Sequence, residues 1–317
     1  MRPLARYTEE TRCFGPDQRL IGTLTLPTSP SMRPMPGLIL LNAGVLPRIG
    51  PHRLNVELAR TAAKLGISAI RFDFPGLGDS GYSSSKLSHD EQALDSIAHA
   101  MNELRGTPSR PDYFVIAGLC SGADVGLQMA LQDESISGLF MIEPYYYPNR
   151  LSGLLRTSRR LREYGIRRAL RRMGETLGHM LSRRHRRREA LPMDPEENAR
   201  PTPSQQEFRR QLTTLLQRGT HLELIYANTL MGKYDLWRHR RRIFHKLPPS
   251  RHFNVHLVPD TDHSFTRIEN RQKLVNHLHH WLKHSGHLLG GSPPTTMMGP
   301  GRKTGTHTLT SSGEPRA

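Results

Sequence analysis

The chain has 317 residues, of which 36% are hydrophobic, and this length allows one large domain or two small ones with a sizeable core. Lys and Arg number 45 against 28 Asp and Glu, so the formal charge of +17 favours acidic partners such as phosphates, acidic proteins or anionic lipid surfaces. No window of about eighteen uncharged apolar residues occurs, which excludes a membrane-spanning helix.

Apolar runs and helical segments alternate through residues 1–150, which we predict to be the first part of the core. Continuous apolar runs, typical of strands that are buried on both faces, occur at 37–41, 67–72, 113–117 and 136–142. Amphipathic spacing predicts helices at 54–65, 89–104 and 123–131. Because parallel neighbours need a crossover and helices are the usual crossovers, this order predicts an α/β fold with a mostly parallel sheet.

The segment 151–219 interrupts the alternation and is rich in arginine and leucine. From Arg156 to Arg188 there are thirteen arginines and only two acids, Glu163 and Glu175, so this stretch carries +11 of the total charge. Its leucines and methionines recur at intervals compatible with one apolar stripe. We therefore predict an inserted helical, basic lid.

The alternation resumes in residues 220–284, which we predict to complete the core. The runs 222–227 and 253–258 are typical of strands, and 267–282 has the spacing of an amphipathic helix. Residues 285–317 are rich in Gly, Pro, Ser and Thr, and we predict a disordered tail there.

The two cysteines, Cys13 and Cys120, cannot by themselves form a disulfide framework or a four-ligand zinc site. This usage is typical of a reducing compartment. The first twenty residues contain no continuous apolar stretch, so no secretory signal is predicted. We expect a cytoplasmic protein, and the sequence assigns neither a cofactor nor a metal.

The most informative segment is the run 112–129, where a buried-strand pattern passes through G-L-C-S-G into a helix. A nucleophile on a tight strand-to-helix turn needs very small residues two positions before and after it. Gly118 and Gly122 meet that demand around Cys120, whereas the equivalent flanks of Ser121 are Leu and Ala. A helix N-terminus also stabilises a thiolate. We predict that Cys120 is the nucleophile; the alternative is a buried, inert cysteine.

The base and the orienting acid are predicted from loops that follow strands. His263 lies after the last predicted strand and satisfies the chain order nucleophile, acid, histidine. Asp235, after the strand 222–227, is the first candidate for the acid, and Glu143, directly after the strand 136–142, is the alternative acid. Either carboxylate could instead be a surface or capping group.

Backbone donors for an oxyanion hole are predicted at two places. The N–H of Ser121, the residue after the nucleophile, is one of them. The second is Ala43 or Gly44, in the loop after the first predicted strand, where small residues let the backbone approach a substrate. The alternative is an ordinary tight turn. His52, further along the same connection, is a possible substrate contact.

Outside the insertion, residues 15–284 resemble the α/β-hydrolase fold enzymes. The segments that carry the resemblance are 38–44, R-F-D-F-P-G-L-G-D-S at 71–80, 118–122 and Asp262-His263. The resemblance implies that 151–219 caps the cleft, since this family commonly holds a helical lid after the sixth strand. The cysteine at the elbow is similar to that of dienelactone hydrolases and polyhydroxyalkanoate synthases. The loop after the seventh strand departs from the family because it lacks the common early aspartate.

These residues predict an acyl-processing hydrolase, an esterase or thioesterase, with a Cys120, His263 and Asp235 triad. A thioester intermediate passes readily to an alcohol, amine or thiol, so an acyltransferase is an alternative. The basic lid would attract an anionic donor such as an acyl-coenzyme A or an acidic acyl carrier protein. A further hypothesis is a catalytically inactive scaffold that binds nucleic acid or a membrane surface through its arginine-rich helix. The insertion has few aromatics for base stacking, which argues against nucleic acid.

Overall fold

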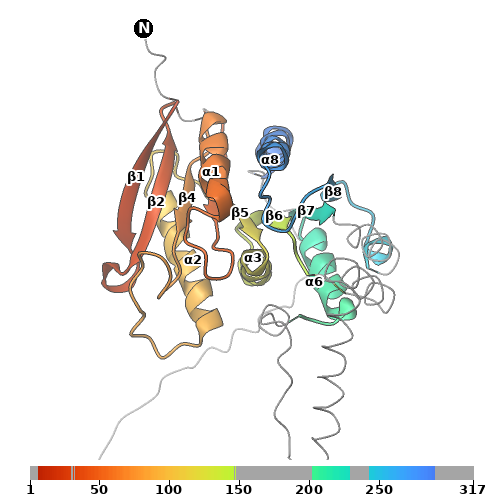
Figure 1. The fold of residues 1–317 in the computed structure, drawn as a ribbon, viewed down its shortest axis with the longest axis horizontal. Helices are drawn as coiled ribbons and strands as arrows, with labels where there is room; N and C mark the ends of the chain where they lie inside the picture. Colours follow the sequence, from red (N-terminus) through yellow and green to blue (C-terminus); the bar gives the residue numbers. More distant parts are fainter. Residues whose placement is uncertain are drawn as a thin grey trace, which may run out of the picture.

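An eight-stranded sheet forms the centre of the computed structural model, which describes residues 6–29, 31, 33–145, 147, 202–228 and 243–289 (Figure 1). The strand order across the sheet is β1-β2-β4-β3-β5-β6-β7-β8. β2 pairs antiparallel with both β1 and β4, and every other neighbouring pair is parallel. The strands are β1 (Tyr7–Phe14), β2 (Leu20–Pro27), β3 (Gly37–Leu40), β4 (Ala69–Phe72), β5 (Phe114–Leu119), β6 (Ile136–Ile142), β7 (His221–Asn228) and β8 (Phe253–Pro259). The predicted α/β fold with a mostly parallel sheet is confirmed.

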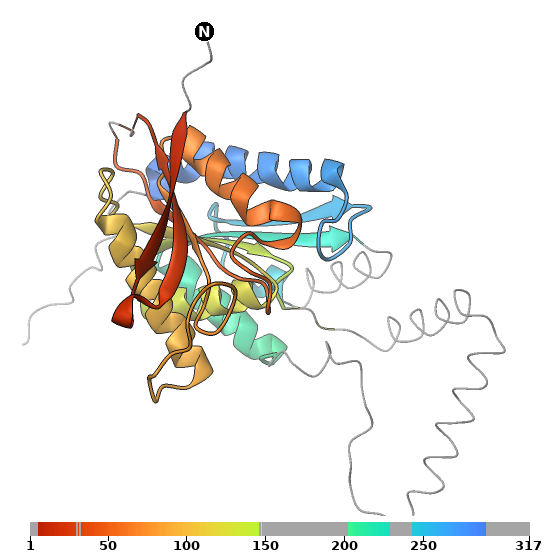
Figure 2. The ribbon, with the colours of Figure 1, turned by 60° about the vertical axis from the view of Figure 1, so that its left-hand side comes forward.

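Helices cover both faces of this sheet (Figures 1 and 2). The helices are α1 (Leu54–Lys64), α2 (His89–Arg105), α3 (Ser121–Gln132), α6 (Gln205–Gln217) and α8 (Ile268–Leu289). α1 and α8 pack against each other on one face, while α2, α3 and α6 cover the opposite face. Each layer encloses its own apolar cluster, so the central strands are buried on both sides. This burial explains why β3 to β6 have continuous apolar runs.

The hairpin of β1 and β2 has no counterpart among the predicted elements. β1 is one of the two edge strands of the sheet, and its residues Tyr7 to Cys13 are partly or fully exposed. An edge strand needs no continuous apolar run, so the pattern that reveals buried strands does not find it. β2 interleaves threonines with leucines and is more buried.

Side chains fix the starts of two of the helices. The Ser88 Oγ accepts a hydrogen bond from the Glu91 N–H at 3.3 Å, and the Ser88 N–H donates to the Glu91 carboxylate at 2.8 Å, which is a capping box for α2. At α6 the Ser204 Oγ accepts from the Glu207 N–H at 3.1 Å. Both helices therefore begin at a residue that the sequence specifies locally.

Helix α6 lies inside the segment 151–219 but packs in the core. The side chains of Phe208, Leu212 and Leu215 are fully buried, and the Phe208 ring makes an edge-to-face contact with Tyr145 at a centroid distance of 5.3 Å. α6 is the crossover that parallel neighbours β6 and β7 require. Residues 205–217 thus belong to the core, which differs from the predicted lid boundary at 219; residues 148–201 lie outside the described residues.

The last helix is longer than the sequence pattern predicts. α8 continues to Leu289, past the expected helix end at 282 and past the start of the predicted tail at Ser285. Residues 290–317 lie outside the described part of the chain. Among the helices that the structure describes, none is both long enough and apolar enough to cross a membrane.

If α6 is part of the core, Phe208→Ala should lower the free energy of unfolding by about 3–5 kcal/mol, because it leaves a cavity against Tyr145. Chemical denaturation of the full chain measures this. The control is Gln206→Ala, an exposed position on the same helix, which should change stability by no more than about 0.5 kcal/mol. Equal effects of the two substitutions would contradict the packing of α6.

Candidate active site

Cys120 lies at the turn between β5 and α3, with φ 55° and ψ −118°. A residue with a Cβ adopts this positive φ only under strain, and such strain is typical of functional turns. The Cys120 N–H donates to the Ile142 carbonyl at 2.9 Å, and the Cys120 carbonyl accepts from the Ala123 N–H at 2.9 Å. The first bond extends the pairing of β5 with β6, and the second begins α3. The turn is therefore held from both sides.

The two glycines of the motif permit the close approach of three backbone segments. A Cβ at Gly118 would lie 2.3 Å from the carbonyl carbon of Gly122, and a Cβ at Gly122 would lie 2.5 Å from the Asn42 carbonyl oxygen. Real Cβ atoms essentially never come so close to another heavy atom. Only glycine fits either position, and the strand, turn and helix predicted around Cys120 are present in the structure.

His263 and Glu143 meet beside Cys120, although they are far apart in the chain. The Nδ1 of His263 lies 3.2 Å from the Oε2 of Glu143. The other carboxylate oxygen accepts a hydrogen bond from the Ala227 N–H on β7. The Glu143 N–H donates to the Ile225 carbonyl at 2.8 Å, and Glu143 has φ 51°. The carboxylate is thus fixed between the ends of β6 and β7 and points at the imidazole.

The surroundings of His263 favour its protonated form. Hydrogen bonds with Cys120 and with Glu143 raise the pKa of His263 from its ordinary 6.5 to about 10, against the opposing effect of burial. An imidazolium beside a thiol in turn favours the thiolate. Cys120, His263 and Glu143 can therefore form a chain of thiolate, imidazolium and carboxylate.

The loop that presents His263 is fixed by its neighbours. The Asp262 carboxylate accepts hydrogen bonds from the Thr266 N–H at 2.9 Å and the Thr266 hydroxyl at 2.6 Å. Phe265 is fully buried, and the Arg271 guanidinium donates to its carbonyl at 3.2 Å. Both Asp262 oxygens thus accept hydrogen bonds within the loop. Asp262 fixes the loop conformation and is not the acid that contacts the His263 ring.

The other predicted site residues have different positions. Asp235, the first candidate for the acid, lies outside the described residues. Glu143, the alternative, is the carboxylate that contacts His263 in the structure. His52 lies in the short helix η2 (Pro51–Arg53) with an exposed side chain, and it is not among the described residues that line the cavity beside the elbow.

The predicted oxyanion donors come from two adjacent segments, the start of α3 and the loop after β3. Ser121 is the first residue of α3. The Gly44 N–H donates to the Ser121 hydroxyl at 2.7 Å, so this group is already occupied. In the part of the chain that the structure describes, the Ala43 N–H has no hydrogen-bond acceptor. Of the two candidates in this loop, Ala43 is therefore the better donor to pair with the Ser121 N–H.

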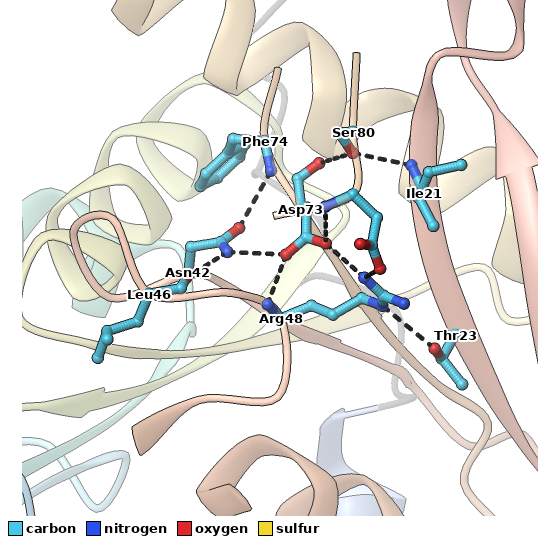
Figure 3. A network of polar contacts seen from close by, with 9 residues as sticks. Ile21, Thr23, Asn42, Leu46, Arg48, Asp73, Phe74 and Ser80 are labelled. Carbon is cyan, nitrogen blue, oxygen red and sulfur yellow. Dashed lines mark hydrogen bonds and ion pairs between the residues drawn. The ribbon is translucent and has the colours of Figure 1, made fainter. Parts of the chain in front are cut away.

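A buried carboxylate holds the loop that carries Ala43 (Figure 3). Asp73 is fully buried directly after β4, and its carboxylate accepts from the Arg48 guanidinium at 2.5 Å, from the Arg48 N–H and from the Asn42 amide at 3.3 Å. The Asn42 amide also donates to the Leu46 carbonyl at 2.7 Å. Residues 42–48 are thus bonded at both ends to one charge.

The glycine-rich turn after β4 packs against the Asp73 carboxylate and donates a hydrogen bond to it. Gly78 has φ +52°, and a Cβ there would lie 2.4 Å from the Asp73 carboxyl carbon. The Asp79 N–H donates to the Asp73 carboxylate at 3.1 Å. The Ser80 hydroxyl donates to the Asp73 carbonyl at 2.7 Å. Asp73 was not predicted as a site residue. The local signal for it is a single acid between Phe72 and Phe74 at the end of a buried strand.

A cavity of about 850 Å³ opens beside the elbow, between α2, α3 and the loop 42–45. Gly44 and Ser121 lie at its edge nearest the elbow. Its wall includes apolar side chains and, among the described residues, two carboxylates. The lining side chains away from the elbow are Phe74, Leu77, His89, Asp90, Ala93, Leu94, Asp124, Val125, Gln128, Gln132, Tyr145, Thr202 and Pro203.

Solved structures share this fold at low sequence identity. A hypothetical protein from Pseudomonas aeruginosa matches with a TM-score of 0.54 and 12% identity over 87% of this chain and 94% of its own. An esterase from Pyrococcus furiosus matches with a TM-score of 0.52 and 16% identity, over 88% and 90%. A predicted CIB-like hydrolase from Thermoplasma acidophilum matches with a TM-score of 0.50 and 11% identity, over 88% and 98%.

These likenesses concern the fold. Together with the sheet order and the elbow, they show that the chain has the α/β-hydrolase fold. No protein-family model matches the chain, and no curated protein matches it.

The elbow should not tolerate a side chain at position 118. We expect Gly118→Ala to unfold the elbow or to lower the rate of Cys120 alkylation by iodoacetamide at least about tenfold, because two backbone segments must separate. Gly81→Ala is the control, since a Cβ there meets nothing closer than 3.6 Å. A normal melting temperature together with normal alkylation of Gly118→Ala would contradict the geometry.

The identity of the acid can be tested through the titration of His263. Glu143→Gln removes one of the two bonds that raise the pKa of His263, so the imidazole should lose its proton at a lower pH than in the wild type. Nuclear magnetic resonance of the histidine rings, assigned with His263→Gln, measures this pKa. Asp235→Asn is the comparison. A fall in pKa in Asp235→Asn and none in Glu143→Gln would refute the assignment of Glu143.

The raised pKa of His263 makes the free energy of unfolding depend on pH. The folded pKa of His263 lies above the unfolded value, so its contribution is fully present below about pH 6.5 and is lost as the pH rises through about 10. In Glu143→Gln this loss should occur at lower pH. Denaturation curves across that range check the direction.

Proposed function

We propose that the protein is an acyl-processing hydrolase, an esterase or thioesterase, that forms a covalent acyl-enzyme at Cys120. The contact of Cys120 with His263, which is itself bonded to Glu143, carries the proposal. The arrangement is the nucleophile, base and orienting acid of covalent acyl transfer. In this proposal Glu143 takes the place of Asp235, the acid first expected from the sequence.

The first half of the reaction acylates the cysteine. The Cys120 thiolate attacks the substrate carbonyl carbon, a C–S bond forms, and the electron pair of the C=O bond moves to its oxygen. The N–H groups of Ala43 and Ser121 stabilise that oxyanion. When the carbonyl reforms, the bond to the leaving group breaks, and the His263 imidazolium donates its proton to the departing alkoxide or thiolate.

The second half releases the acyl group. His263, now neutral, takes a proton from a water molecule as the water oxygen attacks the thioester carbonyl. The C–S bond breaks, Cys120 leaves as the thiolate, and His263 is again the imidazolium. Throughout both steps, the Nδ1–H of His263 donates to the Glu143 carboxylate. This hydrogen bond fixes the orientation of the imidazole ring. An alcohol, amine or thiol in place of the water would make the same site an acyltransferase.

The cavity beside Gly44 and Ser121 supports binding of the acyl portion there. Its apolar residues suit a hydrocarbon chain, and the Asp90 and Asp124 carboxylates disfavour an anionic group at this wall. The +11 charge of residues 156–188 supports a separate anionic portion, such as coenzyme A or an acidic carrier protein.

Labelling with an activated ester tests the nucleophile. Incubation with p-nitrophenyl acetate should add one acetyl mass to the wild-type chain, and Cys120→Ala should abolish the adduct and lower turnover by about 10³-fold or more. Cys13→Ala, which removes the other free cysteine, is the control and should label normally. A persistent adduct in Cys120→Ala at another residue would overturn the proposal.

A further inference from the structure

A second cluster of reactive side chains lies under α8, at the edge of the sheet formed by β8. Glu223 comes from β7, His256 from β8 and His277 from α8. The Oε1 of Glu223 is 2.5 Å from the His277 Nε2 and 2.9 Å from the His256 Nε2. The ligand atoms of all three residues lie within 4.8 Å of one another. Three separate elements thus bring metal-binding atoms to one point.

The cluster has a buried base and an open side. The Glu223 side chain is only 2% exposed, whereas those of His256 and His277 are 42% and 28% exposed. The Asn254 amide donates to the other oxygen, Oε2, at 3.0 Å, which orients the carboxylate so that Oε1 faces both imidazoles. Supporting hydrogen bonds of this kind are typical around metal ligands.

The rings are also held in place by packing. The His256 and His277 rings meet edge to face at a centroid distance of 4.1 Å, and the His277 ring lies 6.0 Å from the ring of Phe140 on β6. Phe140 in turn packs against Trp281, one turn further along α8. The His277 ring is therefore packed against aromatic residues, and the Nε2 atoms of both histidines face the carboxylate.

We propose that Glu223, His256 and His277 bind a divalent transition metal, best matched by Zn²⁺. Two imidazole nitrogens and one carboxylate oxygen are a donor set that zinc prefers, with water in the fourth position on the exposed side. Bonds of about 2.0–2.2 Å in a tetrahedron place the ligand atoms roughly 3.3–3.6 Å apart. The observed separations of 2.5 and 2.9 Å would reach this range if each imidazole moved away from the carboxylate by up to about 1.1 Å.

The metal would join β7, β8 and α8 and would stabilise the C-terminal helix on the sheet. It would not take part in acyl chemistry, since Glu223 lies near the start of β7 while Glu143 is bonded near the end of that strand. The sequence gives no hint of this site because its ligands are spread over residues 223–277 with no short spacing motif.

Zinc binding to the chain tests the site directly. The parent protein carries Cys120→Ala, so that the elbow thiol cannot compete for the metal, and is freed of metal with a chelator. After addition of zinc and removal of the excess, it should retain one equivalent by elemental analysis and melt at a higher temperature than the metal-free form. His256→Gln and His277→Gln, added singly, should each lose that equivalent and the rise in melting temperature.

The matched control is His280→Gln with His284→Gln. These residues form a close pair of histidines one turn apart on α8, with stacked rings at a centroid distance of 6.4 Å, and this control should keep the zinc. Because a substitution could disturb folding, the visible absorption of Co²⁺ in place of zinc gives a second readout, and its tetrahedral spectrum should disappear only in the cluster variants. Retention of the metal by His256→Gln and His277→Gln, or no retained metal in the parent, would overturn the proposal and leave a carboxylate bonded to two imidazoles.

Discussion

The close contact of three backbone segments at the elbow is the constraint on which the candidate site depends. Gly118, Gly122 and the Asn42 carbonyl approach so tightly that a Cβ has no room at either glycine. Cys120 has a positive φ in this turn, and the Gly44 N–H donates to the Ser121 hydroxyl, which joins the loop of Ala43 to the start of α3. The buried charge of Asp73 fixes the far side of that loop. The geometry around the reacting atom therefore depends on backbone contacts and a buried charge outside the proposed triad.

Strand β7 organises two polar clusters that serve different purposes. Near its end, the Ala227 N–H and the Ile225 carbonyl hold Glu143, so the acid of the proposed triad is fixed by backbone groups of a neighbouring strand. Near its start, Glu223 contacts the two imidazoles of His256 and His277 under α8. The first cluster lies where the parallel strands end, which is where loops from several strands can converge. The second cluster joins β7, β8 and α8 away from those strand ends and suits a structural role.

Much of the core and the position of the elbow could be predicted from local sequence. Runs of apolar residues locate β3 to β7 because those strands are covered on both faces, and the run 253–258 also locates β8, although most of its side chains are only partly buried. The spacing of Gly118 and Gly122 locates the turn because its steric demand is local. β1 escaped this pattern because this edge strand is largely exposed, and the leucines of β2 alternate with threonines and so form no continuous apolar run. The helix α6 was included in the predicted lid because composition alone cannot tell a crossover helix from an insertion.

The sequence by itself determined the α/β class, the strand-to-helix turn at Cys120 and a short set of partner residues, because hydrophobic period and glycine spacing act over a few residues. The tertiary structure alone showed that the Glu143 carboxylate reaches His263, that the Gly44 N–H is bonded to the Ser121 hydroxyl, and that Glu223 meets His256 and His277. These outcomes depend on strand order and register, which bring residues up to 120 positions apart to within hydrogen-bond distance. No local pattern carries that information.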